Sequence, residues 1–383
     1  MRASGLAHLI SISGLHIGLV AGLVYSALRA LLALVEPVAL RWPIKKWAAA
    51  GGIAAAAAYT VLVGAPVPTL RSLLMTGLVL LAVMVDRNPF SMRLVAFAAF
   101  AVLLAFPDSL TGPSFQMSFA AVAALIAAYE VLGPRIAAWR PGLGPVGGAM
   151  LYLGGVAVTS AVAGLATLPF TVFHFQQVQL YGILSNMLAV PLTTFWVMPM
   201  GLLVCVTMPF GLDALPLSAM GAGVDAILGV AAWTAGLPGA ALAVPAMPVW
   251  GLCLAGFGLT WLCVWTRPVR LLGIGMVAAA LGSPILAERP DILVGPDGRL
   301  VAVRDAGGRL VLSSTSAERF EGETWLRRNA QAGAESWRRP GRGLGSGIRC
   351  DGLGCLWTAP DGRTVAFVRD RAALAEDCDA AAV

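Results

Sequence analysis

Long apolar runs separated by short polar loops fill the first three quarters of the chain. A helix that crosses a bilayer needs about 20 predominantly apolar residues. About ten runs approach this length, although the fourth is short and the seventh is interrupted by Pro191 and Pro199. Their approximate ranges are 12–35, 48–64, 69–85, 93–106, 114–132, 147–169, 181–208, 217–236, 249–265 and 270–287. The pattern predicts an all-α polytopic membrane domain with about ten transmembrane helices over residues 1–287.

The pattern changes after Ala287, where short alternating segments replace the apolar runs. PDGRLVAVRD at 296–305 recurs as PDGRTVAFVRD at 360–370, and Pro-Asp-Gly before alternating apolar residues is typical of a turn that leads into a strand. The strand candidates are RLVAV (299–303), RLVLSS (309–314), CLWTA (355–359) and RTVAFV (363–368). We predict a small β-rich soluble domain over residues 288–383.

Composition supports the membrane assignment, and charge adds an orientation. Charged residues make up 12% of the chain, against roughly 25% in soluble domains. The tail holds 14 Arg and 14 acidic residues, so the net charge of +6 lies in the membrane part and reflects topology. If the spans alternate, the basic loops fall on one side, which the positive-inside rule makes cytoplasmic. The basic residues on that side are Arg41, Lys45, Lys46, Arg87, Arg93, Arg135, Arg140, Arg267 and Arg270. The tail is then extracytoplasmic.

Polar residues of the membrane part cluster at the predicted outer ends of the spans. The first cluster lies in HLISISGLHIGLV (8–20) and contains Ser11, Ser13, Gly14 and His16. Small and hydroxyl-bearing residues can serve close helix packing in membranes. Alternatively, Gly14 breaks the helix locally and His16 faces a water-filled path, because an ionisable group inside a span indicates function. Both interpretations are open.

A second cluster contains Arg71, which we place in the first turn of the third span. Arg at a helix N-terminus opposes the macrodipole, so it needs another reason to be there. Either the side chain snorkels to the interface, or its guanidinium faces an anion such as a phosphate.

Two further clusters lie on the fifth, sixth and seventh spans. Ser114 is a candidate cap of the fifth span, with Gln116 and Ser118 just inside it, either as packing contacts or facing a cavity. His174 stands among aromatic and glutamine side chains that indicate a membrane belt or, less directly, a base-stacking surface. Asn186 and Pro191 indicate a broken helix that could line a path.

The tail offers little catalytic or metal-binding chemistry. The three His of the chain are His8, His16 and His174, so the tail has no zinc site of the usual kind. We expect no metal, no cofactor and no enzymatic activity. Cys350 and Cys355 either pair in an oxidising compartment or remain free thiols, with Cys378 left over. The arginines around Trp337 (RRNAQAGAESWRRPGRG, 327–343) indicate a solvated loop or a weak nucleic-acid contact.

The motifs in their order resemble the competence domain of the ComEC family. They are GLAHLISISGLHIGL, PTLRSLLM, SFQMSF and LPFTVFHF…LYGILSNMLAVPL, and the resemblance covers roughly residues 2–287. It implies an inner-membrane channel that passes one strand of DNA into the cytoplasm during natural transformation. It also implies that the shared channel motifs include Ser13, Gly14, His16, Arg71, Gln116, Ser118, Asn186 and Pro191. The implied partners are single-stranded DNA, a periplasmic DNA receptor, a cytoplasmic motor and the lipid bilayer, and an oligomer is compatible with this.

Two departures from the family are expected to matter. Family members usually have upstream spans and an extracellular domain, whereas this chain begins inside the first motif, which predicts that the reading frame continues upstream. Many members end in a metallo-β-lactamase-like domain, whose ligands the tail lacks.

Two other classes of protein remain as alternatives. A secondary transporter for a small anion or metabolite would use the broken helices at the bilayer midplane. A membrane-embedded enzyme would need convergent acids, bases or metal ligands, which the few acidic residues of the spans disfavour. No GxxxxGK[ST] motif is present, so energy for transport must come from partners.

Overall fold

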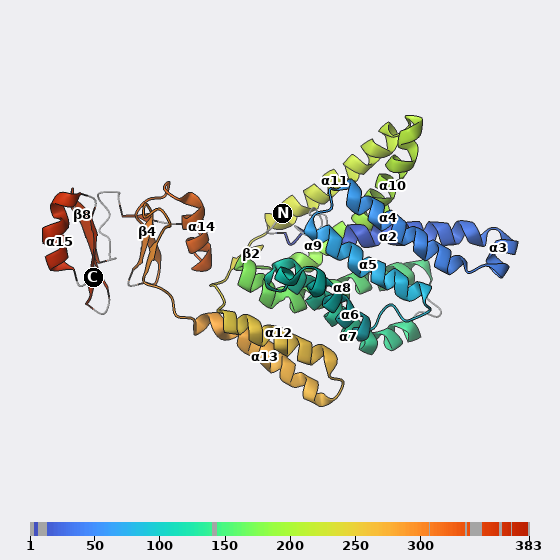
Figure 1. Ribbon diagram of the computed structural model, residues 1–383, viewed down its shortest axis with the longest axis horizontal. Coiled ribbons are helices and arrows are strands. Elements are labelled where there is room, and N and C mark those ends of the chain that lie inside the picture. The colour runs from blue at the N-terminus through green and yellow to red at the C-terminus, as the bar shows by residue number, and fades with distance from the viewer. Residues whose placement is uncertain are drawn as a thin grey trace. The chain divides into compact units, whose positions relative to one another are not determined.

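The computed structural model describes residues 4–6, 14–139, 144–305, 307–333, 335–337, 347–359, 362–368 and 370–381. The chain divides into two compact units (Figure 1). Unit 1 comprises Met1–Thr171, Gln179–Leu242 and Cys253–Ala280, and unit 2 comprises Val172–Val178, Ala243–Leu252 and Leu281–Val383. Each unit is described by itself.

Helices occupy every apolar run that the sequence indicated. They are α2 (Gly14–Ala33), α3 (Glu36–Arg41), α4 (Ile44–Leu62), α5 (Val67–Met84), α6 (Met92–Ala105), α7 (Pro113–Trp139), α8 (Pro145–Phe175), α9 (Gly182–Leu192), α10 (Met198–Thr207), α11 (Ala214–Ala235), α12 (Val249–Val264) and α13 (Leu272–Gly282). Within the described residues, six helical stretches are long and apolar enough to cross a membrane. Three shorter apolar helices accompany them, at Pro68–Met84, Met92–Ala105 and Val249–Val264. The membrane character is therefore confirmed, and the number of ten spans stays a prediction.

Small residues allow α2, α4 and α5 to pack closely in unit 1. Ala49 and Ala56 of α4 are completely buried together with Ile17 and Ala21 of α2. A Cβ on Gly52 would lie 3.0 Å from the carbonyl oxygen of Ala21, so the two backbones are already at contact distance. Lipid chains are as apolar as leucine, and membrane helices therefore associate through such close packing. This three-helix core holds the start of α2 next to the second turn of α5.

The seventh run is not broken at its prolines, because Gly182–Phe210 is one continuous helical stretch that contains a π-helical segment. The segment η2 (Thr193–Val197) separates α9 from α10, and the backbone N–H of Met198 donates to the carbonyl of Thr193. Pro191 lies in the last turn of α9 and Pro199 in the first turn of α10. Proline cannot donate a helical hydrogen bond, and its ring clashes with the preceding turn, which the wider π turn accommodates.

Unit 2 contains two small sheets. One has the order β3-β4-β5-β6 (Ile292–Val294, Val301–Arg304, Leu310–Leu312, Glu335–Ser336), and the other has the order β7-β8-β9 (Ile348–Cys350, Gly354–Thr358, Thr364–Val368). All four strand candidates coincide with observed strands. The helix α14 (Arg319–Arg328), which the sequence did not indicate, lies between β5 and β6, and α15 (Leu374–Ala380) follows the second sheet. Another short sheet pairs β1 (Gln177–Gln179) with β2 (Ala241–Ala243).

A shared apolar core joins the two sheets of the tail. It contains Trp337 and Trp357, which are 5% and 2% exposed, packed with Val303 and Val311 of the first sheet and Ile348 of the second. The prediction of a solvated loop around Trp337 is therefore wrong at this residue, because the indole completes the core. Arg338, Arg339 and Arg342 lie outside the described residues.

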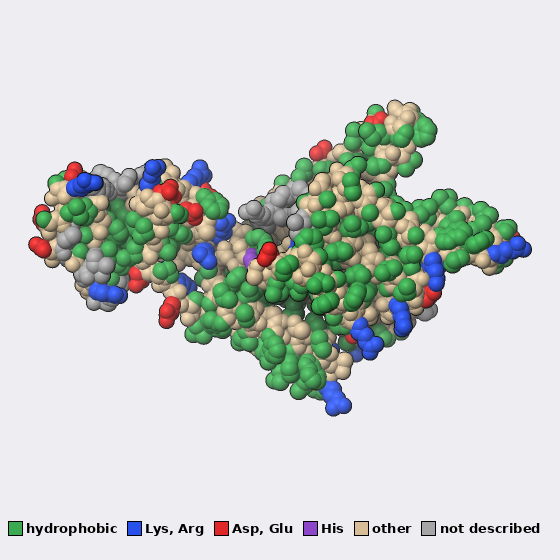
Figure 2. Space-filling model, in the orientation of Figure 1, with side chains coloured by type: hydrophobic (Ala, Val, Ile, Leu, Met, Phe, Trp, Pro, Cys, Tyr) green, Lys and Arg blue, Asp and Glu red, His purple; other side chains and the backbone are tan. Residues whose placement is uncertain are grey.

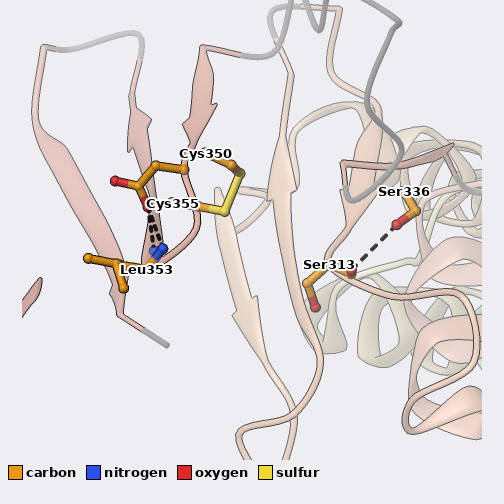
Figure 3. The surroundings of a disulfide bond; sticks show 7 residues. Ser313, Ser336, Cys350, Leu353 and Cys355 are labelled. Carbon is orange, nitrogen blue, oxygen red and sulfur yellow. Dashed lines mark hydrogen bonds between the residues drawn. A yellow bond between two sulfur atoms is a disulfide. The ribbon is translucent and has the colours of Figure 1, made fainter. Parts of the chain in front are cut away.

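Of the two alternatives for Cys350 and Cys355, the structure has the disulfide (Figure 3). The two cysteines face each other across the β7–β8 hairpin. The carboxylate of Asp351 accepts hydrogen bonds from the N–H groups of Leu353 and Gly354 at 2.8 and 2.7 Å, which closes the turn. The disulfide therefore locks a hairpin that already has a well-paired turn. The side chain of Cys378 lies outside the described part of the chain.

Candidate functional site

Arg71 is a buried cation near the start of α5. Its side chain is 8% exposed, and its Nη2 atom donates a hydrogen bond to Ser114 Oγ of α7. It is the fifth residue of α5, so the prediction that it lies in the first turn is wrong by about one residue. No described carboxylate forms an ion pair with it. The guanidinium is therefore turned toward α7 rather than toward the surface, with one of its five donors used by Ser114.

The first turns of α7 carry the next predicted site residues. Ser114 is not the cap of this helix, because α7 begins at Pro113, whose fixed φ suits the first helical position. Ser114 instead accepts the hydrogen bond from Arg71. Gln116 Nε2 donates to the carbonyl of Leu110 at 2.9 Å, and Ser118 is exposed one turn after Ser114. The amide of Gln116 therefore ties the preceding 3-10 helix η1 (Pro107–Thr111) to α7.

The start of α2 meets the start of α5. A Cβ on Gly14 would lie 3.3 Å from Ser72 Oγ, so glycine allows the close approach. Gly14 is the first residue of α2, and His16 is half-buried in the same turn. His8, Ser11 and Ser13 lie outside the described residues. The structure thus brings the first three predicted motifs together through Gly14, Ser72, Arg71 and Ser114.

Asn186 holds an unsatisfied polar atom on α9. Its Oδ1 is buried and makes no hydrogen bond, whereas Ser185 next to it donates to the carbonyl of Ser4 at 2.6 Å. Leu6 is completely buried against Ala189 of α9. The segment that precedes α2 therefore starts against α9. An orphaned buried carbonyl oxygen costs about 1–3 kcal/mol, and none of the residues that the structure describes supplies a partner for it.

Acidic side chains lie away from these residues. Asp86, just after α5, forms an ion pair with Lys46 at the start of α4 at 2.7 Å. The hydrogen bond from Lys46, together with the charges of Lys46 and Lys45, lowers the pKa of Asp86. Figure 2 shows the Lys and Arg side chains of unit 1 gathered over α3 and over the loop ends of its helices. Glu130 and Asp225, the two acids inside predicted spans, are both exposed.

The structure does not place His174 with the other predicted site residues. It belongs to unit 2, at the end of α8, and lines a pocket of about 280 Å³. The neighbouring Gln176 adopts a left-handed backbone conformation with φ of 53° and is 7% exposed. The pocket is lined by Phe173, His174, Gln176, Ala246, Met247, Thr324, Arg327 and Arg328. Sequence reasoning missed this pocket, because its two halves are about 150 residues apart.

No described group of three or more His, Cys, Asp or Glu side chains could hold a metal ion. The polar side chains that do converge are cationic, hydroxyl-bearing or amide-bearing. This donor set suits an anion or a hydrogen-bonding polymer.

The competence protein family model matches residues 1–269, which is well over half of the chain. The chain belongs to the competence protein family. It is 29% identical over 205 residues to ComE operon protein 3 of Bacillus subtilis, covering 51% of this chain and 22% of that protein. It is 40% identical over 126 residues to competence protein ComA of Neisseria gonorrhoeae, covering 33% of this chain and 18% of that protein. A similar match covers 52% of the chain and 25% of the uncharacterized protein YcaI of Escherichia coli, at 30% identity.

The chain thus spans about a quarter or less of these relatives. No solved structure matches it. Family membership and the apolar helices together make this a membrane protein of the competence protein family.

Proposed function

We propose that the chain forms part of a channel in the bacterial inner membrane that passes single-stranded DNA into the cytoplasm during natural transformation. The observation that carries the proposal is Arg71: a buried guanidinium bonded to Ser114, without a described carboxylate partner, in a chain of the competence protein family. Burying a cation is costly unless an anion compensates it. A phosphate of a passing strand would provide that anion.

The positions of the helix N-termini also support a path for DNA. The N-terminal parts of α2, α5 and α7 meet through Gly14, Ser72, Arg71 and Ser114. Each helix N-terminus carries about half a positive charge and unpaired backbone N–H groups, which favour phosphate binding. Arg presents a planar fork of donors that matches phosphate oxygens. A polyanion crossing here would meet donors and positive potential.

Asn186 adds a neutral polar group to the proposed path. Its orphaned oxygen can accept a hydrogen bond from the amino or imino groups of an unpaired base. The adjacent π-helical segment exposes backbone groups that regular helices conceal, and such segments often mark functional sites. Ser118 and His16 would face the same path, and Pro191 would maintain its shape.

The orientation is part of the proposal. With about ten spans, the basic loops would lie in the cytoplasm, and the helix starts that bear the polar residues would face outward, as would the β-rich tail. The channel would have no enzymatic activity of its own. A periplasmic receptor would deliver the strand and a cytoplasmic motor would draw it in, within an assembly that could be oligomeric.

A secondary transporter for a small anion is the second candidate. The π-helical segment between α9 and α10 favours it, because π segments often mark functional sites and transporters use irregular helices at their substrate sites. Such a protein would transport its substrate independently of competence and would not affect the fate of DNA.

Substitutions of Arg71 test the proposal in the host of this chain. Transformation frequency and membrane abundance are measured for Arg71→Ala, Arg71→Lys and the control Arg93→Ala, which removes an exposed charge near the start of α6. We expect Arg71→Ala to abolish transformation and Arg71→Lys to restore only part of it, because Lys lacks the fork. Normal transformation by Arg71→Ala at wild-type abundance would refute the role of this residue.

A further inference from the structure

We propose that the pocket formed by the end of α8 and the end of α14 is a second binding site for the DNA strand, holding one backbone phosphate within unit 2. The inference rests on the proposed function, since it names a further contact of the same substrate. All residues that line the pocket belong to unit 2.

Backbone contacts hold the walls of the pocket in place. After α8 the chain turns at Gln176, whose N–H donates to the carbonyl of Val172 at 3.1 Å and whose carbonyl accepts from Val244 at 2.9 Å. Two residues later, the N–H of Ala246 donates to the carbonyl of Arg328 at 2.9 Å. The last residue of α14 is thereby fixed to the segment that follows β2. The pocket is therefore a built feature of unit 2 and not a gap between mobile loops.

The charge of the pocket is positive. Arg327 and Arg328 line it, and no carboxylate does. The nearest acid on the same helix, Glu323, is ion-paired with Arg319 at 2.8 Å. The C-terminus of α14 contributes about half a negative charge, which two full guanidinium charges exceed. The pocket therefore favours an anion.

One of the two guanidinium groups is oriented in advance. Arg327 Nη2 donates to Thr324 Oγ1 at 3.2 Å, and Thr324 Oγ1 donates to the carbonyl of Phe320 at 2.8 Å. Because the hydroxyl hydrogen of Thr324 is already used, this residue positions Arg327. The remaining N–H groups of Arg327 are available to phosphate oxygens. Preorganisation of this kind reduces the side-chain entropy lost on binding.

The aromatic side of the pocket suits a nucleotide more than a bare ion. The rings of Phe173 and His174 pack edge to face with centroids 5.0 Å apart. An aromatic side chain next to basic groups is the arrangement that binds single strands by stacking a base and neutralising a phosphate. A volume of about 280 Å³ admits roughly one phosphate with part of a nucleoside, and pockets for larger ligands are typically bigger.

Binding of a labelled oligonucleotide tests the site. The full chain is placed in nanodiscs of neutral lipid, and fluorescein-labelled oligothymidylate is titrated by anisotropy at several salt concentrations. The variants are Arg327→Gln with Arg328→Gln, and Arg319→Gln as a control that removes one charge from the same helix. The side chain of Arg319 is 79% exposed and lies outside the pocket. Thermal unfolding and mapping of the Cys350–Cys355 disulfide show that each variant is folded.

We expect the double variant to lose about tenfold or more in affinity, because hydrogen bonds to charged groups are the strong ones. We also expect the slope of log K against log salt to fall by about 0.7 for each phosphate contact removed. The control Arg319→Gln should bind like the wild type. Equal affinities of the folded double variant and the control for the oligonucleotide would overturn the proposal that this pocket binds DNA.

Two other outcomes would also overturn it. One is that the wild type does not bind oligothymidylate. The other is that the double substitution weakens only binding to vesicles that contain phosphatidylglycerol, which would make the pocket a lipid-headgroup site. Neither outcome decides the channel proposal, which the transformation frequency of the Arg71 variants tests separately.

Discussion

The replacement of Asn186 by Leu tests whether Asn186 serves function or supports the fold. In the structure, Asn186 Oδ1 is buried and forms no hydrogen bond with any described residue. The cost of removing this atom from water is therefore not compensated within the described part of the chain. Leu has the same branched arrangement of four side-chain heavy atoms and no polar atom. If Asn186 is present for a ligand, Asn186→Leu should make the protein more stable and less active.

The magnitude follows from the orphaned atom. Leaving a buried polar group unsatisfied costs about 1–3 kcal/mol. Polar contacts inside membrane proteins average about 0.6 kcal/mol, so the lower end of that range applies. Asn186 is only half-buried, which leaves room for the branched side chain. We expect the free energy of unfolding to rise by about 1 kcal/mol.

The neighbouring residue provides the control, with the opposite sign. Ser185 is completely buried and donates to the carbonyl of Ser4 at 2.6 Å. Ser185→Ala removes a buried hydrogen-bond donor, which should lower the free energy of unfolding by about 1–2 kcal/mol. The assay is reversible unfolding in mixed micelles, with transformation frequency measured in parallel. Destabilisation by Asn186→Leu as large as that by Ser185→Ala would refute the reasoning, because Asn186 would then support the fold.

Three further predictions concern stability. Gly273→Val should destabilise the packing of α12 against α13 by about 1–3 kcal/mol, because the new Cβ would lie 2.5 Å from the carbonyl oxygen of Gly258 in α12. Gly275→Val is the control, since a Cβ at Gly275 meets nothing within 4 Å. Equal unfolding free energies of the two variants would contradict the prediction. Replacing Cys350 and Cys355 by Ser should destabilise the tail by about 2 kcal/mol in thermal unfolding, and a reductant should then have no further effect. The pKa of Asp86 is lowered, so its carboxylate should stabilise the fold above a pH of about 4 and lose this contribution as the pH falls through its folded pKa. The difference in unfolding free energy between the wild type and Asp86→Asn should therefore shrink at low pH. A difference that persists in acid would contradict this prediction.

Long apolar runs were sufficient to predict the helices of the membrane part, and alternation predicted the tail strands β4, β5, β8 and β9. A run such as 217–236 has no alternative to a helix, and strands such as Thr364–Val368 follow a turn and alternate in character. The helix α14 escaped prediction because RFEGETWLRR buries only Gly322 and Leu326, too few apolar positions to produce a period.

The site was predictable in its members and not in its contacts. The sequence indicated Arg71 and Gln116 as polar residues in apolar surroundings. It did not indicate that Arg71 would bond to Ser114, because a local rule made Ser114 a helix cap while Pro113 took the first helical position. The pocket at His174 was not predictable, since it depends on tertiary pairing with a helix that the pattern did not reveal.

Site-specific photocrosslinking in transforming cells tests the central claim most directly. A photoreactive residue is placed at position 116, one turn into α7, where the proposed path runs. The control position is 81 on α5, because Leu81 is apolar, 48% exposed and not part of the proposed path. Labelled transforming DNA is added, and crosslinked strands are identified on denaturing gels. We expect position 116 to crosslink to a single strand and position 81 to remain unlabelled. Labelling of position 81 alone, or of neither position during normal DNA uptake, would contradict a strand path along these helix starts.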